Sequence, residues 1–190
     1  MHAIAQKMRR PIVLVGFMGA GKSTVGPRLA ERLAVPFVDL DAGIERATGE
    51  TVESLFAGAG EVAFRRLESA ALGVALAELA RGGVIAGGGG LFAEPANRNR
   101  IAAGGALVAW LDTPLAEITQ RLGGDRSRPL FQDAVAVDRL YRDRNAVYAA
   151  ADVRVDASGA DPEAVVDRLL AVLAERAGTP PPGSPGPPMD

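Results

Sequence analysis

The stretch Gly16-Phe17-Met18-Gly19-Ala20-Gly21-Lys22-Ser23-Thr24 decides the fold of this chain. It fits the phosphate-loop pattern GxxxxGK[ST], which joins a buried strand to the N-terminus of a helix. The context agrees, because an aliphatic run at 12–15 precedes it and Val25, Leu29 and Leu33 follow at helical spacing. A chance glycine-rich turn is the alternative. The stretch therefore predicts a nucleoside triphosphate site, where backbone N–H groups and the helix dipole bind phosphates.

Two side chains of this loop carry the expected chemistry. Lys22 can bridge the β- and γ-phosphates of a nucleotide, and Ser23 offers its hydroxyl to Mg²⁺. Both roles depend on the helix N-terminus that the pattern predicts.

Composition narrows the possible chemistry. The chain has 190 residues, 48% of them apolar, and a formal net charge of −2. This predicts one domain and gives no reason to expect a nucleic-acid partner. Cysteine is absent and the single histidine, His2, lies near the N-terminus, which excludes thiolate and histidine catalysis and a cysteine-based zinc site. We find neither a run of about 18 apolar residues nor a secretory signal, and so expect a cytoplasmic protein with no membrane partner.

Short apolar runs alternate with helical patterns along the chain. This predicts an α/β fold in which a central, five-stranded parallel sheet is flanked by helices. The expected strands are 12–16, 37–39, 84–86, 107–111 and 153–155. The expected helices are 22–34, 42–48, 60–81, 94–103, 114–122, 136–150 and 162–177. We expect one domain over residues 1–177 and a disordered tail, rich in proline and glycine, over 178–190.

Two aspartates, Asp39 and Asp41, follow the second expected strand in the sequence FVDLD. The carboxyl ends of the strands in an open α/β sheet face the ligand crevice, which brings both acids beside the nucleotide. If the chain stays extended, alternation places them on the same side. One could then hold Mg²⁺ through water while the other accepts a proton from a substrate hydroxyl. The alternative is that one of them caps the helix expected from Ala42.

Three further segments are candidates for ligand binding. Arg65 lies on an expected helix, where a single arginine is ordinarily exposed or paired with a neighbour such as Glu68. The glycines 87–90 directly follow a strand and permit close approach of a ligand. The loop 123–131 opens with two glycines and carries two arginines, which predicts a mobile lid over about 123–133. An ordinary surface loop is the alternative.

Taken in order, these motifs resemble one family, the shikimate kinases, which are small P-loop kinases. The matching motifs are GFMGAGKST, FVDLDAGIE, FRRLE, the run GGGG, RPLF in the expected lid and RNAVY on the helix that follows it. They span nearly the whole chain. The chain departs from the family at three positions. Gly87 stands where family members usually have threonine or leucine, Phe131 where leucine is commoner, and Ala146 where proline is usual. Neither Gly87 nor Ala146 replaces a side chain expected to contact a ligand, and Phe131, with the short lid, concerns lid closure rather than the reaction.

The resemblance implies a role for each candidate residue. ATP would be held by Gly19, Ala20, Gly21, Lys22, Ser23 and Thr24, with Arg121 against the adenine and Arg128 reaching the phosphates from the lid. Mg²⁺ would be bound by Ser23 and, through water, by Asp39. Shikimate would be surrounded by Asp41, Arg65, Gly88, Gly89, Gly90 and Arg144, the two arginines being on its carboxylate.

The reaction that the resemblance implies is ATP-dependent phosphorylation of the 3-hydroxyl of shikimate, a step toward chorismate and the aromatic amino acids. Asp41 would take the proton of the hydroxyl, while Lys22, Arg128 and Mg²⁺ stabilise charge on the transferring group. The alternatives are a kinase of a gluconate-like hydroxy acid and a non-catalytic ATP-binding module. We expect a monomer whose only partners are small molecules.

Overall fold

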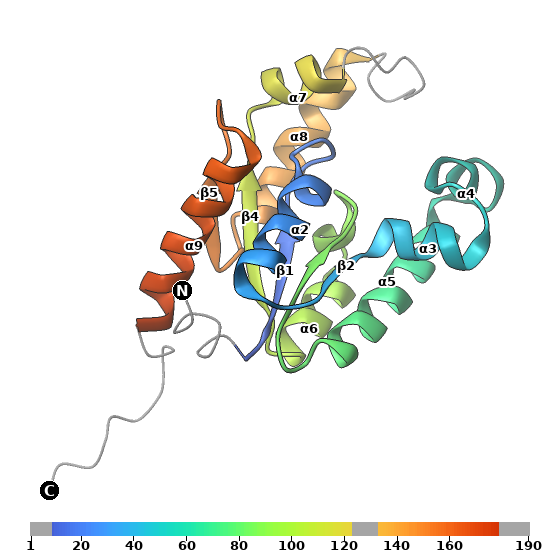
Figure 1. Ribbon diagram of the computed structural model, residues 1–190. Coiled ribbons are helices and arrows are strands. Elements are labelled where there is room, and N and C mark those ends of the chain that lie inside the picture. Colours follow the sequence, from blue (N-terminus) through green and yellow to red (C-terminus); the bar gives the residue numbers. More distant parts are fainter. Residues whose placement is uncertain (1–8, 123–132, 179–190) are drawn as a thin grey trace, which may run out of the picture.

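Five strands form one sheet in which every pairing is parallel (Figure 1). The structure, a computed structural model, describes residues 9–122 and 133–178. Along the sheet the strand order is β2-β3-β1-β4-β5, and so β1 lies in the centre. The strands are β1 (Pro11–Val15), β2 (Phe37–Asp39), β3 (Gly83–Ala86), β4 (Leu107–Asp112) and β5 (Val153–Asp156). The expected fold class and number of strands are confirmed.

The helices cover both faces of the sheet (Figure 1). They are α2 (Lys22–Leu33), α3 (Leu40–Thr48), α4 (Val52–Gly58), α5 (Gly60–Glu78), α6 (Pro95–Ala103), α7 (Leu115–Leu122), α8 (Ala134–Tyr148) and α9 (Pro162–Gly178), with a 3-10 turn, η1 (Leu91–Ala93). No helix in the described ranges is long and apolar enough to span a bilayer.

Alternation along β1 explains why its sequence is apolar throughout. Ile12 and Leu14 belong to a core shared with α2 and α9, whereas Val13 and Val15 belong to a second core shared with α5, α6 and α8. All four side chains are buried. A strand covered on both faces has no position for a polar residue. Because β1 is the central strand, the phosphate loop that follows it begins in the middle of the sheet.

Capping residues account for the main differences from the predicted elements. Helix α3 begins at Leu40 rather than at residue 42, because the Asp39 carboxylate accepts a hydrogen bond from the N–H of Ala42 at 3.2 Å. The chain is therefore not extended through Asp41, and the alternation that would place Asp39 and Asp41 on the same side of a strand does not apply. Helix α4 was not predicted; the Thr51 hydroxyl caps it by accepting from the N–H of Ser54 at 3.1 Å.

Other boundaries differ by a few residues. Helix α5 ends at Glu78, before the predicted end at 81, and α8 begins at Ala134 because Asp133 accepts from two N–H groups of the first turn. The expected lid lies almost wholly outside the described residues, and the tail beyond residue 178 lies outside them too. The lid and the division of the chain at residues 177 and 178 stay predictions.

Candidate active site

A cavity of about 510 Å³ lies where the segments following β1, β2 and β3 meet. The phosphate loop lines it together with Asp41, Gly87–Gly89 and Arg121. The carboxyl ends of parallel strands form this kind of crevice. All predicted residues of the phosphate loop from Gly19 to Thr24 line this cavity.

Lys22 is buried at the floor of the cavity, with 7% of its surface exposed. Its Nζ donates to the carbonyl oxygens of Gly16 and Phe17, at 2.8 and 2.9 Å. Burial lowers the pKa of Lys22 to about 8, although the charges of Asp41 and Asp39 act in the opposite direction. The ammonium is therefore held over its own loop, at the place where phosphate oxygens could replace the two carbonyls.

Asp41 lies in the first turn of α3 and faces a second carboxylate, that of Glu68. Burial, followed by the charge of Glu68 and then that of Asp39, raises the pKa of Asp41 to about 6. A Cβ atom built on Gly88 would lie 2.8 Å from Glu68 Oε1 and 3.5 Å from Asp41 Oδ1, so both acids face the glycines that follow β3. These two oxygens are buried without a hydrogen-bond partner among the described residues. Such oxygens are available to a ligand.

Asp39 uses one carboxylate oxygen as the cap of α3 and still contributes charge to the cavity. It affects the pKa of both Lys22 and Asp41, which places its carboxylate near theirs. The cap that we considered for either aspartate thus belongs to Asp39, and Asp41 stays free for chemistry. Carboxylate and hydroxyl oxygens are the ligand types that suit Mg²⁺. Among the described residues, no group of three or more aspartate, glutamate, histidine or cysteine side chains is arranged so that it could hold a metal ion.

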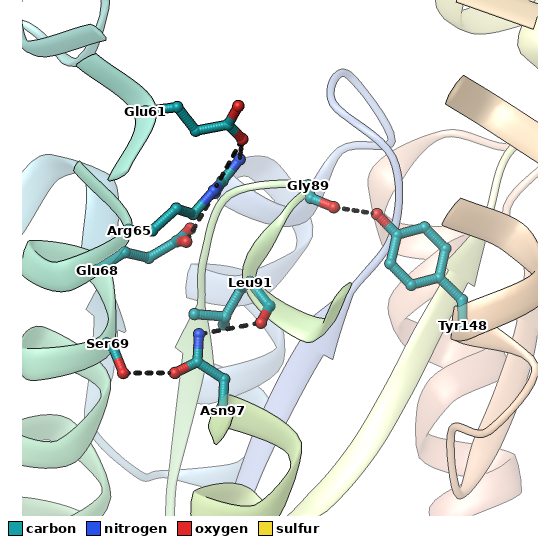
Figure 2. Close-up of polar contacts among 8 residues, drawn as sticks. All are labelled: Glu61, Arg65, Glu68, Ser69, Gly89, Leu91, Asn97 and Tyr148. Carbon is teal, nitrogen blue, oxygen red and sulfur yellow. Dashed lines mark hydrogen bonds and ion pairs between the residues drawn. The ribbon is translucent and has the colours of Figure 1, made fainter. Parts of the chain in front are cut away.

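Arg65 is held by two acids on its own helix. It pairs with Glu68 at 2.7 Å and with Glu61 at 3.2 Å, and its side chain is only 18% exposed (Figure 2). A Cβ atom on Gly90 would overlap the guanidinium, so the arginine lies directly against the backbone of this glycine. The expected pair with Glu68 is present, and the arginine lies at the glycine run rather than out in solvent.

The remaining predicted arginines are in three different situations. Arg144, on α8, is half-buried and forms no ion pair with any described residue. Its charge acts on buried Tyr148, one turn later on α8, which places the two side chains near each other. Arg121 lines the cavity and pairs with Glu117 at 3.1 Å. Arg128 lies outside the described residues.

Sequence reasoning missed three residues around the glycine run. Glu68 was considered only as a surface partner of Arg65, yet its side chain is fully buried and faces the cavity acids. Tyr148 donates to the carbonyl of Gly89, and Asn97 joins α6 to two neighbouring segments (Figure 2). The motifs FRRLE and RNAVY contained Glu68 and Tyr148, but nothing in the sequence shows what they contact.

Comparison with known proteins identifies the family of this chain. Residues 18–174 match the family described as shikimate kinase. A shikimate kinase of Persephonella marina is 40% identical over 162 residues, which cover 85% of this chain and 97% of the relative. One of Thermosynechococcus vestitus is 43% identical over 166 residues, covering 85% of this chain and 88% of the relative.

Solved structures give the same result. A shikimate kinase from Acinetobacter baumannii in complex with shikimate has a TM-score of 0.79 and 32% identity, covering 92% of this chain and 98% of its own. A gluconokinase from Sinorhizobium meliloti, at 20% identity and a TM-score of 0.56 over 89% of this chain and 94% of its own, shares the fold alone. From the family match and the identity of these relatives, this chain belongs to the shikimate kinase family.

Proposed function

We propose that this chain transfers the γ-phosphoryl group of ATP to the 3-hydroxyl of shikimate, giving 3-phosphoshikimate and ADP. Membership of the shikimate kinase family supports both substrates and a place in aromatic biosynthesis. The observation that carries the proposal is the position of Asp41. Its carboxylate lies in the cavity that the phosphate loop lines, and its buried Oδ1 has no partner among the described residues. A carboxylate in this position can accept the proton of an attacking hydroxyl.

The charges around Asp41 suit that role. With a pKa raised to about 6, Asp41 is ionised at neutral pH and is a stronger base than an exposed aspartate. Lys22 lines the same cavity, and its pKa of about 8 keeps it charged at neutral pH. The ammonium can therefore stabilise the transferring phosphoryl group. Arg128 adds positive charge from the lid in this proposal.

The other end of the acceptor is bound by arginine. Arg65 and Arg144 bind the shikimate carboxylate in this proposal, and the backbone of residues 88–90 approaches the ring closely. Arg65 already lies against Gly90, and its two acidic partners hold the guanidinium in one orientation. A planar anion matches the fork of a guanidinium, which orients the ring relative to Asp41.

The nucleotide end has donors of the right kind for ATP with Mg²⁺. The hydroxyl of Ser23 lines the cavity and the charge of Asp39 acts on both cavity residues that carry the chemistry, so these two would hold the ion, Asp39 through water. When bound, Mg²⁺ neutralises charge on the phosphates. Arg121 would lie against the adenine, beside an apolar wall that lines the same cavity, made by Ala157, Ala160, Pro162 and Val165.

A coupled assay of ADP release, run with shikimate and with gluconate, tests this function. Release with shikimate and not with gluconate is expected. Release only with gluconate would establish the alternative kinase, and ATP binding by calorimetry without release for either acceptor would establish a non-catalytic module. The proposal also includes a monomer that acts in the cytoplasm on small molecules alone.

A further inference from the structure

Two side chains from different helices hold the glycine loop, by which we mean residues 88–91. The Tyr148 hydroxyl of α8 donates to the carbonyl of Gly89 (Figure 2). The Asn97 amide of α6 donates to the carbonyl of Leu91, at 3.1 Å. The loop is therefore anchored at two carbonyls, one from each side.

With these two anchors, all four carbonyl groups of the glycine loop accept hydrogen bonds. The carbonyls of Gly88 and Gly90 accept from backbone N–H groups within the turn, at 3.1 and 3.0 Å. By contrast, the N–H groups of Gly89 and Gly90 donate to no other described residue. The loop thus turns its carbonyl groups to the protein and keeps N–H groups for a ligand.

Burial makes both anchors hard to replace. Tyr148 is 1% exposed and Asn97 is fully buried, so water cannot substitute for the partner that either one loses. Burial also raises the pKa of Tyr148, which keeps its hydroxyl protonated and able to donate. Buried hydrogen bonds of this kind therefore fix the position of the loop.

Each anchor also connects to a helix that carries one of the two arginines. Tyr148 follows Arg144 by one turn on α8, and the charge of Arg144 acts on it. Asn97 accepts from the Ser69 hydroxyl at 2.7 Å, and Ser69 follows Arg65 by one turn on α5 (Figure 2). The glycine loop is therefore the link between the two arginine helices.

The arginine on α5 is in direct contact with this link. Even one added carbon on Gly90 would overlap the Arg65 guanidinium, so there is no free space between the loop and the arginine. A shift of the loop toward α5 or α8 must therefore move Arg65 or change its distance from Arg144.

We propose that Tyr148 and the Ser69–Asn97 pair are positioning residues that set the separation of Arg65 and Arg144 through the glycine loop, and so the affinity for the substrate carboxylate. This inference rests on the proposed function. It predicts an effect on the acceptor, with the nucleotide side of the cavity left unchanged.

Tyr148→Phe tests the anchor, because it removes one hydroxyl and keeps the ring. We expect the KM for shikimate to rise about 3- to 10-fold, the range that the loss of one neutral hydrogen bond gives, with the KM for ATP within about twofold. Tyr141→Phe is the matched control, since Tyr141 lies on the same helix and donates to the carbonyl of Thr113 at 3.0 Å, away from the loop. The control should change the KM for shikimate less than about twofold.

Two more measurements separate positioning from a general loss of structure. Ser69→Ala cuts only the link to α5 and should raise the KM for shikimate about 2- to 5-fold; it decides the matter if Tyr148→Phe does not fold. In an Arg144→Lys background, Tyr148→Phe should have a smaller effect than in the wild type, because the group it positions is gone. Fluorescence of Trp110, whose ring centroid lies 6.0 Å from that of Tyr148, reports whether each variant is folded.

Several outcomes would overturn the inference. The first is that Tyr148→Phe changes the KM for shikimate and the KM for ATP equally. The second is that it raises the KM for shikimate no more than Tyr141→Phe does. The third is that it raises the KM for shikimate by the same factor in the Arg144→Lys background as in the wild type. A wild-type protein that releases no ADP with shikimate would instead refute the proposed function, and so the two failures are distinguishable.

Discussion

Asp41→Asn is expected to stabilise the fold while it removes turnover. The pKa of Asp41 is raised from 3.8 to about 6, first by burial and then by the charges of Glu68 and Asp39. At neutral pH the folded protein therefore carries an ionised carboxylate in an unfavourable place. Asparagine has nearly the same shape and no charge, and its amide can donate to the buried Glu68 oxygen that has no partner among the described residues.

The sign of the pH dependence follows from proton linkage. Between pH 3.8 and about 6 the folded protein keeps a proton on Asp41 that the unfolded chain has released, so the free energy of unfolding falls as the pH rises and levels off above about 6. Complete transmission of this pKa difference would amount to about 3 kcal/mol. Because Asp41 lines an open cavity, we expect about 1 to 2 kcal/mol at pH 7.5 and about a third of that at pH 4.5.

Urea unfolding of the wild type and the variant at these two pH values measures the difference. Asp143→Asn is the control, because it removes one negative charge from an exposed position on α8 and should change stability by less than about 0.5 kcal/mol at both pH values. A variant less stable than the wild type at pH 7.5, or equally stabilised at both, would refute the reasoning. Turnover should fall by about 10²- to 10⁴-fold. Retention of more than about a tenth of it would remove Asp41 as the base.

Three other predictions concern catalysis and acceptor binding. The kcat/KM for shikimate should rise with ionisation of Asp41 near pH 6 and fall with deprotonation of Lys22 near pH 8; a flat profile between pH 5 and 9 would contradict these assignments. Gly90→Ala should raise the KM for shikimate at least about 10-fold, because its φ of −93° admits alanine while the added carbon displaces the Arg65 guanidinium; unchanged kinetics would place Arg65 outside the site. Arg144→Lys should raise the KM for shikimate about 30- to 150-fold with little change for ATP, and unaltered shikimate kinetics would exclude Arg144.

The sheet and the phosphate loop could be predicted because their signals are local. An apolar run such as residues 12–15 is buried wherever it lies in a doubly covered strand, and the loop that follows it has a fixed spacing. Helix α4 was missed for the opposite reason. It has seven residues and buries only Leu55, so no apolar periodicity announces it, although Thr51 as a capping residue was a usable signal.

The two aspartates show where local chemistry leaves a choice open. Both have a side chain that caps helices, and the sequence alone does not say which N–H group comes within reach. The structure assigns the cap to Asp39, so that α3 begins two residues earlier than predicted and Asp41 lies in its first turn. That turn brings Asp41 next to Glu68 and produces its raised pKa.

The two halves of the site differ in how far apart their residues lie in the chain. The phosphate-binding half is contiguous over residues 16–24, whereas the acceptor half that we propose combines segments after β2 and β3 with helices α5 and α8. The bond from Tyr148 to Gly89 spans 59 residues and that from Ser69 to Asn97 spans 28, and both depend on how helices pack against the sheet. A motif can therefore identify the nucleotide, but the acceptor depends on tertiary packing. Substitutions that shift α5 or α8 should change acceptor affinity while the phosphate loop, built on the central strand, stays in place.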